Sequence, residues 1–186
     1  MNNNQKLIII TGPSGVGKGT VIKEILKKDQ KFWLSVSATT RNPRDGEIDG
    51  QDYYFLSKTK FKQMINDGLF LEWAKFAGNY YGTPLASINE KIIEGYWVIL
   101  EIEVDGAGQV RKKFPNSFSI FLLPPNKHEL EKRIRSRGTD KEESILKRLE
   151  RADFEIGSSK DFDFVLKNAE VDETVNKVLS TIKKQS

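Results

Sequence analysis

The sequence contains no cysteine, a single histidine and no long apolar segment. Without cysteine, neither a disulfide framework nor a thiolate metal site can form, which is typical of a protein in a reducing compartment. The longest apolar runs are far shorter than the roughly 20 residues that span a bilayer, and the polar start of the chain lacks the apolar core of a signal peptide. We therefore expect a cytoplasmic protein with no membrane-spanning segment.

Net charge is also small. The chain has 30 Lys and Arg residues against 26 Asp and Glu residues, a formal net charge of +4. This excess is too small to indicate a nucleic-acid-binding surface, and the sequence has neither an aromatic-basic array nor a recognition-helix pattern. We expect no nucleic-acid partner, whereas a small polyanion fits the charge. The sequence leaves the oligomeric state open.

The 186 residues, of which 38% are hydrophobic, suit one domain with a core of ordinary size. Short apolar runs alternate with helical patterns, which predicts an α/β fold with a parallel sheet core flanked by helices. We expect strands at about 7–11, 35–38, 53–56, 96–102, 117–123 and 164–166. We expect helices at about 18–28, 58–67, 85–94, 126–156 and 172–183.

A glycine-rich loop separates the first expected strand from the first expected helix. It comprises Gly12, Pro13, Ser14, Gly15, Val16, Gly17, Lys18, Gly19 and Thr20. Glycines permit backbone conformations in which successive N–H groups turn inward around phosphate oxygens, and the following helix N-terminus favours the same anion. Lys18 adds a point charge for the β- and γ-phosphates. An ordinary glycine-rich turn is the alternative, but the strand and helix context favours a nucleoside triphosphate site.

One position departs from the usual phosphate-loop pattern, in which a Ser or Thr hydroxyl follows the lysine and binds magnesium. Here Gly19 follows Lys18, and the hydroxyl comes one residue later, in Thr20. The run Gly-Lys-Gly-Thr resembles that of nucleoside monophosphate kinases. We therefore expect Mg²⁺ near Thr20 to be bound through water rather than by direct ligation.

A second basic segment, at 39–47, contains Arg41 and Arg44 with Pro43 between them. Proline disfavours a continuous helix here, so the segment is expected to be a loop. Two guanidinium groups on such a loop can bind one phosphate with paired hydrogen bonds. A solvated basic loop is the alternative.

Further segments belong with this one: SVSATTRNPRDGEIDGQDYYF at 35–55, FLEWA at 70–74, GNYYGT at 78–83, and RGT, EESI and RL between 137 and 149. With these residues the chain resembles the guanylate kinase family, whose members transfer phosphate from ATP to GMP. The resemblance extends from about Lys6 to Lys183. It implies a P-loop kinase fold with ATP and GMP as substrates, Mg²⁺ as cofactor, and ADP and GDP as products. No residue is assigned to the ribose 2′-OH, so the expectation extends to dGMP.

The resemblance also implies a division of the chain. A single domain over 5–184 would consist of a core at 5–36, 84–125 and 158–184, a mobile GMP-binding region at 37–83, and an arginine-rich lid at 126–157. The insertion and the lid are expected to close on the core.

Carried over to this sequence, the resemblance assigns four residues to the GMP phosphate: Arg41, Arg44, Tyr53 and Tyr81. It assigns Ser37, Glu72 and Thr83 to guanine. Guanine presents two adjacent donors, N1–H and the 2-amino group, and one carboxylate can accept from both, whereas adenine lacks the pair. A surface charge is the alternative for Glu72. Of Tyr80 and Tyr81, only Tyr81 is expected to be a ligand.

Three acids lie at alternate positions at the end of the expected strand at 96–102 and just beyond it. Period two would place Glu101, Glu103 and Asp105 on one side, and ligands of open α/β sheets lie at the carboxyl ends of strands. Glu103 stands where the family often has aspartate, and we assign it to the guanine amino group. We assign Glu101 to the surroundings of Mg²⁺. A solvated strand end is the alternative.

Several arginines lie in the expected helical stretch 126–156. By resemblance, Arg137 and Arg148 belong to a lid over ATP, and Arg133, four residues before Arg137, joins them. With Lys18 and Arg41, Arg137 and Arg148 are the candidate catalytic residues, because phosphoryl transfer depends on positive charge around the migrating group. Surface ion pairs are the alternative for Arg135 and Arg151. Asn168 matches the family position near adenine.

Two other functions compete with a GMP kinase. One is a non-catalytic guanylate-kinase-like binding module, but such modules usually have a degraded phosphate loop, which is intact here. The other is a kinase of a different small phosphate, which Ser37, Glu72 and Thr83 disfavour.

Overall fold

The computed structural model describes residues 6–76, 78–136 and 142–185. Their strands form two sheets. The larger sheet has the order β2-β7-β1-β8-β9, and all four neighbouring pairs are parallel. Its strands are β1 (Leu7–Thr11), β2 (Phe32–Leu34), β7 (Trp97–Glu101), β8 (Phe118–Leu123) and β9 (Phe164–Lys167). The predicted parallel sheet core is confirmed.

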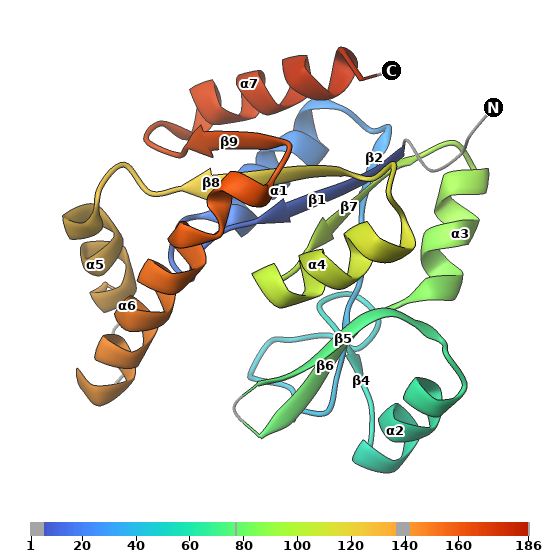
Figure 1. Cartoon of the computed structure of the whole chain (residues 1–186). Helices are drawn as coiled ribbons and strands as arrows, with labels where there is room; N and C mark the ends of the chain where they lie inside the picture. Colours follow the sequence, from blue (N-terminus) through green and yellow to red (C-terminus); the bar gives the residue numbers. More distant parts are fainter. Residues whose placement is uncertain (1–5, 77, 137–141, 186) are drawn as a thin grey trace.

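Helices cover both faces of this sheet, as Figure 1 shows. On one face lie α1 (Lys18–Lys28) and α7 (Val171–Lys183), and on the other lie α3 (Leu85–Ile93) and α4 (Val104–Lys113). The central strand β1 is therefore wholly apolar up to Ile10, and each of its residues is completely buried. A strand covered on both faces has no solvent side, which explains the unbroken run of isoleucines.

A smaller sheet lies beyond the carboxyl ends of the core strands, with the order β4-β3-β6-β5. Its strands are β3 (Ala38–Thr39), β4 (Tyr54–Phe55), β5 (Phe70–Phe76) and β6 (Asn79–Pro84). Helix α2 (Lys58–Asn66) packs on it through Phe61, whose ring stacks on those of Phe70 and Tyr80 at 4.3 and 5.5 Å. This cluster is separate from the two core clusters.

A third unit consists of α5 (Lys127–Arg135) and α6 (Glu142–Gly157), which lie beside one another at one side of the core in Figure 1. Leu130 and Ile134 of α5 pack on Ile145 and Ala152 of α6 in a small cluster of their own. A 3₁₀ turn (Ser159–Asp161) leads from α6 back to the core sheet. None of the described helices combines the length and apolar character needed to cross a membrane.

Three predicted elements were wrong. The expected strand at 35–38 is instead a passage between the sheets: β2 pairs with β7 as far as Leu34, and β3 pairs with β6 from Ala38. The single expected helix at 126–156 is two helices, and α5 ends at Arg135 with Ser136 as its C-cap. The prediction that Arg133 and Arg137 share one helical face cannot be followed further, because Arg137 lies outside the described residues.

The third error concerns the acids after β7. The strand ends at Glu101, Glu103 is the N-cap residue of α4, and Asp105 lies in the first turn of that helix. Period two does not apply to a helix, so the three acids are not placed on one side by strand geometry.

Gly12 directly follows β1, and its substitution tests whether the loop requires this backbone conformation. Its φ is 145°, and an added Cβ would lie 2.4 Å from the carbonyl oxygen of Leu122. We expect Gly12→Ala to lower the free energy of unfolding by about 2 kcal/mol or more, since both the backbone and the contact become strained. Gly108→Ala, in open space on α4, should stabilise by about 0.5–1 kcal/mol. Urea denaturation measures the free energy of unfolding of both variants. Equal changes in the two variants would contradict the expectation.

Candidate functional site

The phosphate loop connects β1 to α1, and α1 begins at Lys18. Its N-cap residue, Gly17, has a left-handed backbone with φ 98° and offers no side chain to the first amide groups of the helix. These N–H groups therefore remain available to an anion. Lys18 Nζ donates to the carbonyl oxygens of Gly12 (2.6 Å) and Pro13 (3.4 Å), so the lysine lies across its own loop.

Asn168 and Arg133 support this loop from outside. Asn168 is 2% exposed, and its Nδ2 donates to the carbonyl oxygen of Val16 at 2.8 Å. Arg133 Nη1 donates to the same oxygen at 3.2 Å and to the carbonyl oxygen of Asn168 at 3.4 Å. Arg133 also forms an ion pair with Glu129 of its own helix. Asn168 Oδ1 is buried and has no hydrogen-bond partner within the described residues.

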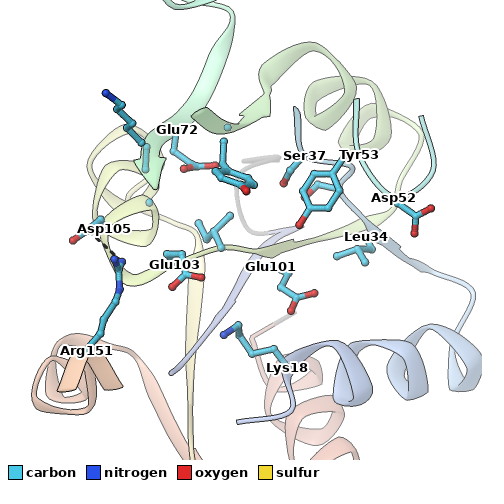
Figure 2. Close-up of a pocket in the computed structure, with 17 residues that line it drawn as sticks. Lys18, Leu34, Ser37, Asp52, Tyr53, Glu72, Glu101, Glu103, Asp105 and Arg151 are labelled. Atoms are coloured by element: carbon cyan, nitrogen blue, oxygen red, sulfur yellow. Dashed lines mark ion pairs between the residues drawn. The ribbon is translucent and has the colours of Figure 1, made fainter. Parts of the chain in front are cut away.

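A cleft of about 390 Å³ lies between the phosphate loop and the smaller sheet. Figure 2 shows Lys18 and Glu101 on one side of it and Glu72, Ser37 and Tyr53 on the other. The lining includes seven of the residues predicted from the sequence: Lys18, Ser37, Tyr53, Glu72, Tyr81, Glu101 and Glu103. Residues far apart in the chain thus meet at the carboxyl ends of parallel strands, as the fold class predicts.

Glu72 is the most buried acid of the lining, with 5% of its area exposed. It lies on β5 opposite Thr83 of β6, and Thr83 Oγ1 donates to Glu72 Oε1 at 2.6 Å. Burial raises the pKa of Glu72 above its ordinary value, although the hydrogen bonds from Thr83 and the charge of Lys113 act in the opposite direction. A ligand that donates further hydrogen bonds to such a buried carboxylate would stabilise its charged form.

Arg41 is held in a bidentate pair by Glu47. Its Nη1 and Nη2 donate to the two carboxylate oxygens at 2.9 and 2.8 Å, and the main-chain N–H of Arg44 donates to Glu47 at 2.7 Å. The Arg41 bonds, and next the Arg44 amide, lower the pKa of Glu47 to about 2. The Arg41 guanidinium also lies 5.4 Å from the ring centroid of Tyr53, which contacts Tyr81 edge-on.

The structure therefore brings Arg41, Tyr53 and Tyr81 together, whereas the Arg44 side chain is exposed. Glu47 is a member of this cluster that the sequence analysis missed. An acid three residues after Arg44 in the same loop was a usable signal, because an isolated pair of arginines repels itself.

The acids after β7 converge on the cleft in a different way from that predicted. The carboxylate oxygens of Glu101 lie 3.8 Å from the place that a Cβ on Gly19 would take, so Glu101 lies beside the start of α1. Glu103 and Asp105 enter from the start of α4. In the parts of the chain that the structure describes, no cluster of three His, Cys, Asp or Glu residues could hold a metal. Thr20 is exposed and does not line the cleft.

The arginines of α5 and α6 differ in their surroundings. Arg135 forms the predicted surface pairs, one with Glu131 and a bidentate one with Glu142. Arg148 is half-buried on α6. Arg151 lines the cleft, where its Nη2 lies 3.9 Å from Asp105 of α4 and its Nε donates to the buried Glu155. Arg151 is 42% exposed and ion-paired, as the surface alternative predicts, and it also lines the cleft.

Comparison with known proteins agrees with this arrangement. The family model "Guanylate kinase" matches residues 4–185. The guanylate kinase of Prochlorococcus marinus (strain MIT 9312) is 66% identical over 98% of this chain and 99% of its own length. That of Synechocystis sp. (strain ATCC 27184 / PCC 6803 / Kazusa) is 48% identical over 95% and 93% of the two chains.

Among solved structures, the guanylate kinase from Anaplasma phagocytophilum superimposes with a TM-score of 0.78 at 29% identity, over 96% of this chain and 85% of that one. The agreement covers the core sheet, the smaller sheet and the helices together, which is the arrangement expected of a P-loop kinase fold. The chain belongs to the guanylate kinase family.

Proposed function

We propose that this protein transfers the γ-phosphoryl group of ATP to GMP, forming ADP and GDP, and thereby serves purine nucleotide metabolism and the recycling of GMP. The observation that carries the proposal is a single cleft lined by Lys18 of a phosphate loop and by the buried carboxylate of Glu72. The first is suited to a nucleoside triphosphate, and the second to a base with two adjacent donors.

The donor site is the loop from Gly12 to Thr20. The unsatisfied amide groups at the start of α1 and the charge of Lys18 would bind the β- and γ-phosphates. For Lys18 this means leaving the carbonyl oxygens of Gly12 and Pro13, to which it donates in the free protein. Asn168 and Arg133 hold Val16 from the far side of the loop, and Asn168 Oδ1 is an acceptor suited to the adenine amino group.

The acceptor phosphate would bind at the Arg41 cluster with Arg44, Tyr53 and Tyr81. Arg41 is the best placed of these, since Glu47 and the rings of Tyr53 and Phe55 already fix its guanidinium. The Arg44 side chain is exposed and would swing in with its loop.

Guanine would bind at Glu72, with the hydroxyls of Ser37 and Thr83 serving its acceptors O6 and N7 and with Glu103 near the 2-amino group. Ser37, Glu72 and Glu103 line one cleft, and Thr83 reaches it through its bond to Glu72. AMP would leave the buried carboxylate without its donors. When a polar group is left unpaired in this way, kcat/KM for the wrong substrate can be lower by about 10⁴-fold. Because no residue here is committed to the 2′-OH, we propose that dGMP is also accepted.

The transfer itself is direct and in line. The acceptor oxygen is already anionic, so no general base is needed, and the tasks of the protein are to align two polyanions, neutralise them and exclude water. Lys18 and Arg41 supply charge in the free protein, and we propose that Arg137 and Arg148 join them on closure.

Magnesium would neutralise charge on the β- and γ-phosphates when it is bound with ATP. The donor set fits this role, because Mg²⁺ usually keeps several waters and uses one or two carboxylates with substrate phosphates rather than an all-protein cage. Glu101, an exposed carboxylate beside Gly19, is the residue we propose for the hydrated ion, with Thr20 nearby in the chain.

We propose that the GMP-binding region, 37–83, and the lid, 126–157, close as units on the core at 5–36, 84–125 and 158–184. Separate hydrophobic clusters support this division, since the smaller sheet with α2 and the α5–α6 pair each pack around their own apolar residues. A unit with its own core can move without exposing that of its neighbour. Leu71 of β5 packs on Ala107 and Val110 of α4 in the core cluster, so we propose that the GMP-binding region turns about this β5–α4 contact. The cytoplasmic location stays a prediction, which fractionation of cells would test.

Acceptor specificity tests the function. With MgATP as donor, we expect ADP formation with GMP and little or none with AMP, CMP, UMP or dTMP. Lys18→Met should abolish turnover without changing the circular dichroism spectrum, which distinguishes a kinase from a binding module. Equal rates with AMP and GMP would refute the guanine assignment, and full turnover by the Lys18 variant would refute the donor site.

Glu72→Gln tests the base site directly. The amide keeps the size of the side chain but replaces one acceptor by a donor, so a charge-assisted hydrogen bond of about 1.5–3 kcal/mol is lost. We expect kcat/KM for GMP to fall by about 10–100-fold, while KM for ATP changes little. Glu90→Gln, the same change at an exposed position on α3, is the matched control. An unchanged kcat/KM in the Glu72 variant would remove Glu72 from the site.

A further inference from the structure

Strand β5 ends the smaller sheet, so its outer edge has no neighbouring strand within the described chain. Backbone groups at such an edge need other partners. At Trp73 the partner is the side-chain amide of Gln109 on α4. Trp73 N–H donates to Gln109 Oε1 at 3.3 Å, and Gln109 Nε2 donates to the Trp73 carbonyl oxygen at 2.8 Å. The amide thus forms the two-bond pairing that a strand residue would form.

Lys113 continues the same contact one turn later. Its Nζ donates to the carbonyl oxygen of Leu71 at 2.8 Å and to that of Phe70 at 3.2 Å. The carbonyl groups on both sides of Glu72, those of Leu71 and Trp73, are therefore hydrogen-bonded to α4. The backbone that carries Glu72 cannot shift along or away from the helix without breaking these bonds.

Gly106 completes the contact at the carboxylate itself. A Cβ added there would lie 2.6 Å from Glu72 Oε2, so only a glycine lets the side chain approach α4 this closely. Gly106, Gln109 and Lys113 are spaced at i, i+3 and i+7, which places them on one helical face. We name these three residues the α4 stripe.

The helix that carries the α4 stripe is fixed to the core. Ala107 and Val110 are completely buried in the cluster that includes Leu100 of β7 and Leu71 of β5. The start of α4 also carries Glu103 into the cleft. One rigid helix thus sets the place of Glu72 relative to the acids after β7.

We propose that Gln109 is a specificity-determining positioning residue, which through the α4 stripe holds the Glu72 carboxylate at the height and angle that guanine requires. The inference rests on the proposed GMP kinase function. Gln109 acts through Glu72 and touches no substrate. The competing interpretation is that the stripe only stabilises the fold.

Gln109→Leu separates the two interpretations. It keeps the bulk of the side chain but removes both hydrogen bonds to Trp73. We expect KM for GMP to rise about 10-fold and the ratio of kcat/KM for GMP to that for AMP to fall by the same factor, because AMP does not use the carboxylate. KM for ATP, and kcat at saturating GMP, should change less than about 3-fold. Gln63→Leu, the same change at an exposed position on α2, is the matched control.

Gly106→Ala reaches the same carboxylate without touching Gln109. Its methyl group should displace Glu72 Oε2 and raise KM for GMP, whereas Gly108→Ala, two residues along in open space, should leave it unchanged. This pair keeps the proposal testable even if Gln109→Leu does not fold.

The outcomes are distinct. Loss of GMP selectivity in the Gln109 and Gly106 variants, but not in their controls, supports the positioning role. Unchanged selectivity in both variants overturns it. In that case, any loss of activity would parallel a loss of thermal stability and would affect GMP and AMP alike. A wild-type protein with no GMP-dependent turnover would instead refute the proposed function.

Discussion

A carboxylate with almost no access to water must find hydrogen-bond donors, and the 5% exposed Glu72 finds one in Thr83. Burial favours its neutral form, as the direction of its pKa shift indicates. We propose that a base with two adjacent donors relieves this cost when it binds, and that Glu72 selects guanine for this reason. The smaller sheet places Glu72 opposite Thr83, and α4 fixes the strand from its other edge.

The two cations that we propose for phosphate binding are also paired before any ligand binds. Lys18 and Arg41 both have protein partners in the free molecule, the carbonyl of Gly12 for the first and the carboxylate of Glu47 for the second. These contacts hold the cations in defined places before any anion arrives. Such pairs must loosen or share their cation when phosphate binds. We propose that the α5–α6 pair and the smaller sheet with α2, which have hydrophobic clusters of their own, move with this change.

Local signals predicted part of this architecture well. The strand Leu7–Thr11 and the helix Lys18–Lys28 have the predicted bounds, because a fully apolar run and a glycine loop mark them without ambiguity. Helix α4 was missed, since Gly106 and Gly108 lower its helix propensity and its first turn continues an acidic alternation. The prediction of a strand at 35–38 was wrong, because alternation of apolar and polar residues does not reveal a segment that passes from one sheet to the other. Gln109 had no usable signal, because its role depends on a strand more than 30 residues earlier in the chain.

The central claim is that the Glu72 carboxylate recognises the pair of donors on guanine. Calorimetric binding of GMP and of inosine monophosphate in the absence of ATP tests it most directly, because inosine monophosphate keeps N1–H and O6 and lacks only the 2-amino group. We predict that the wild-type protein binds GMP at least about 10-fold more tightly than inosine monophosphate, and that Glu72→Gln reduces this difference, part of which Glu103 retains. Equal affinities for the two nucleotides in the wild-type protein would contradict the claim.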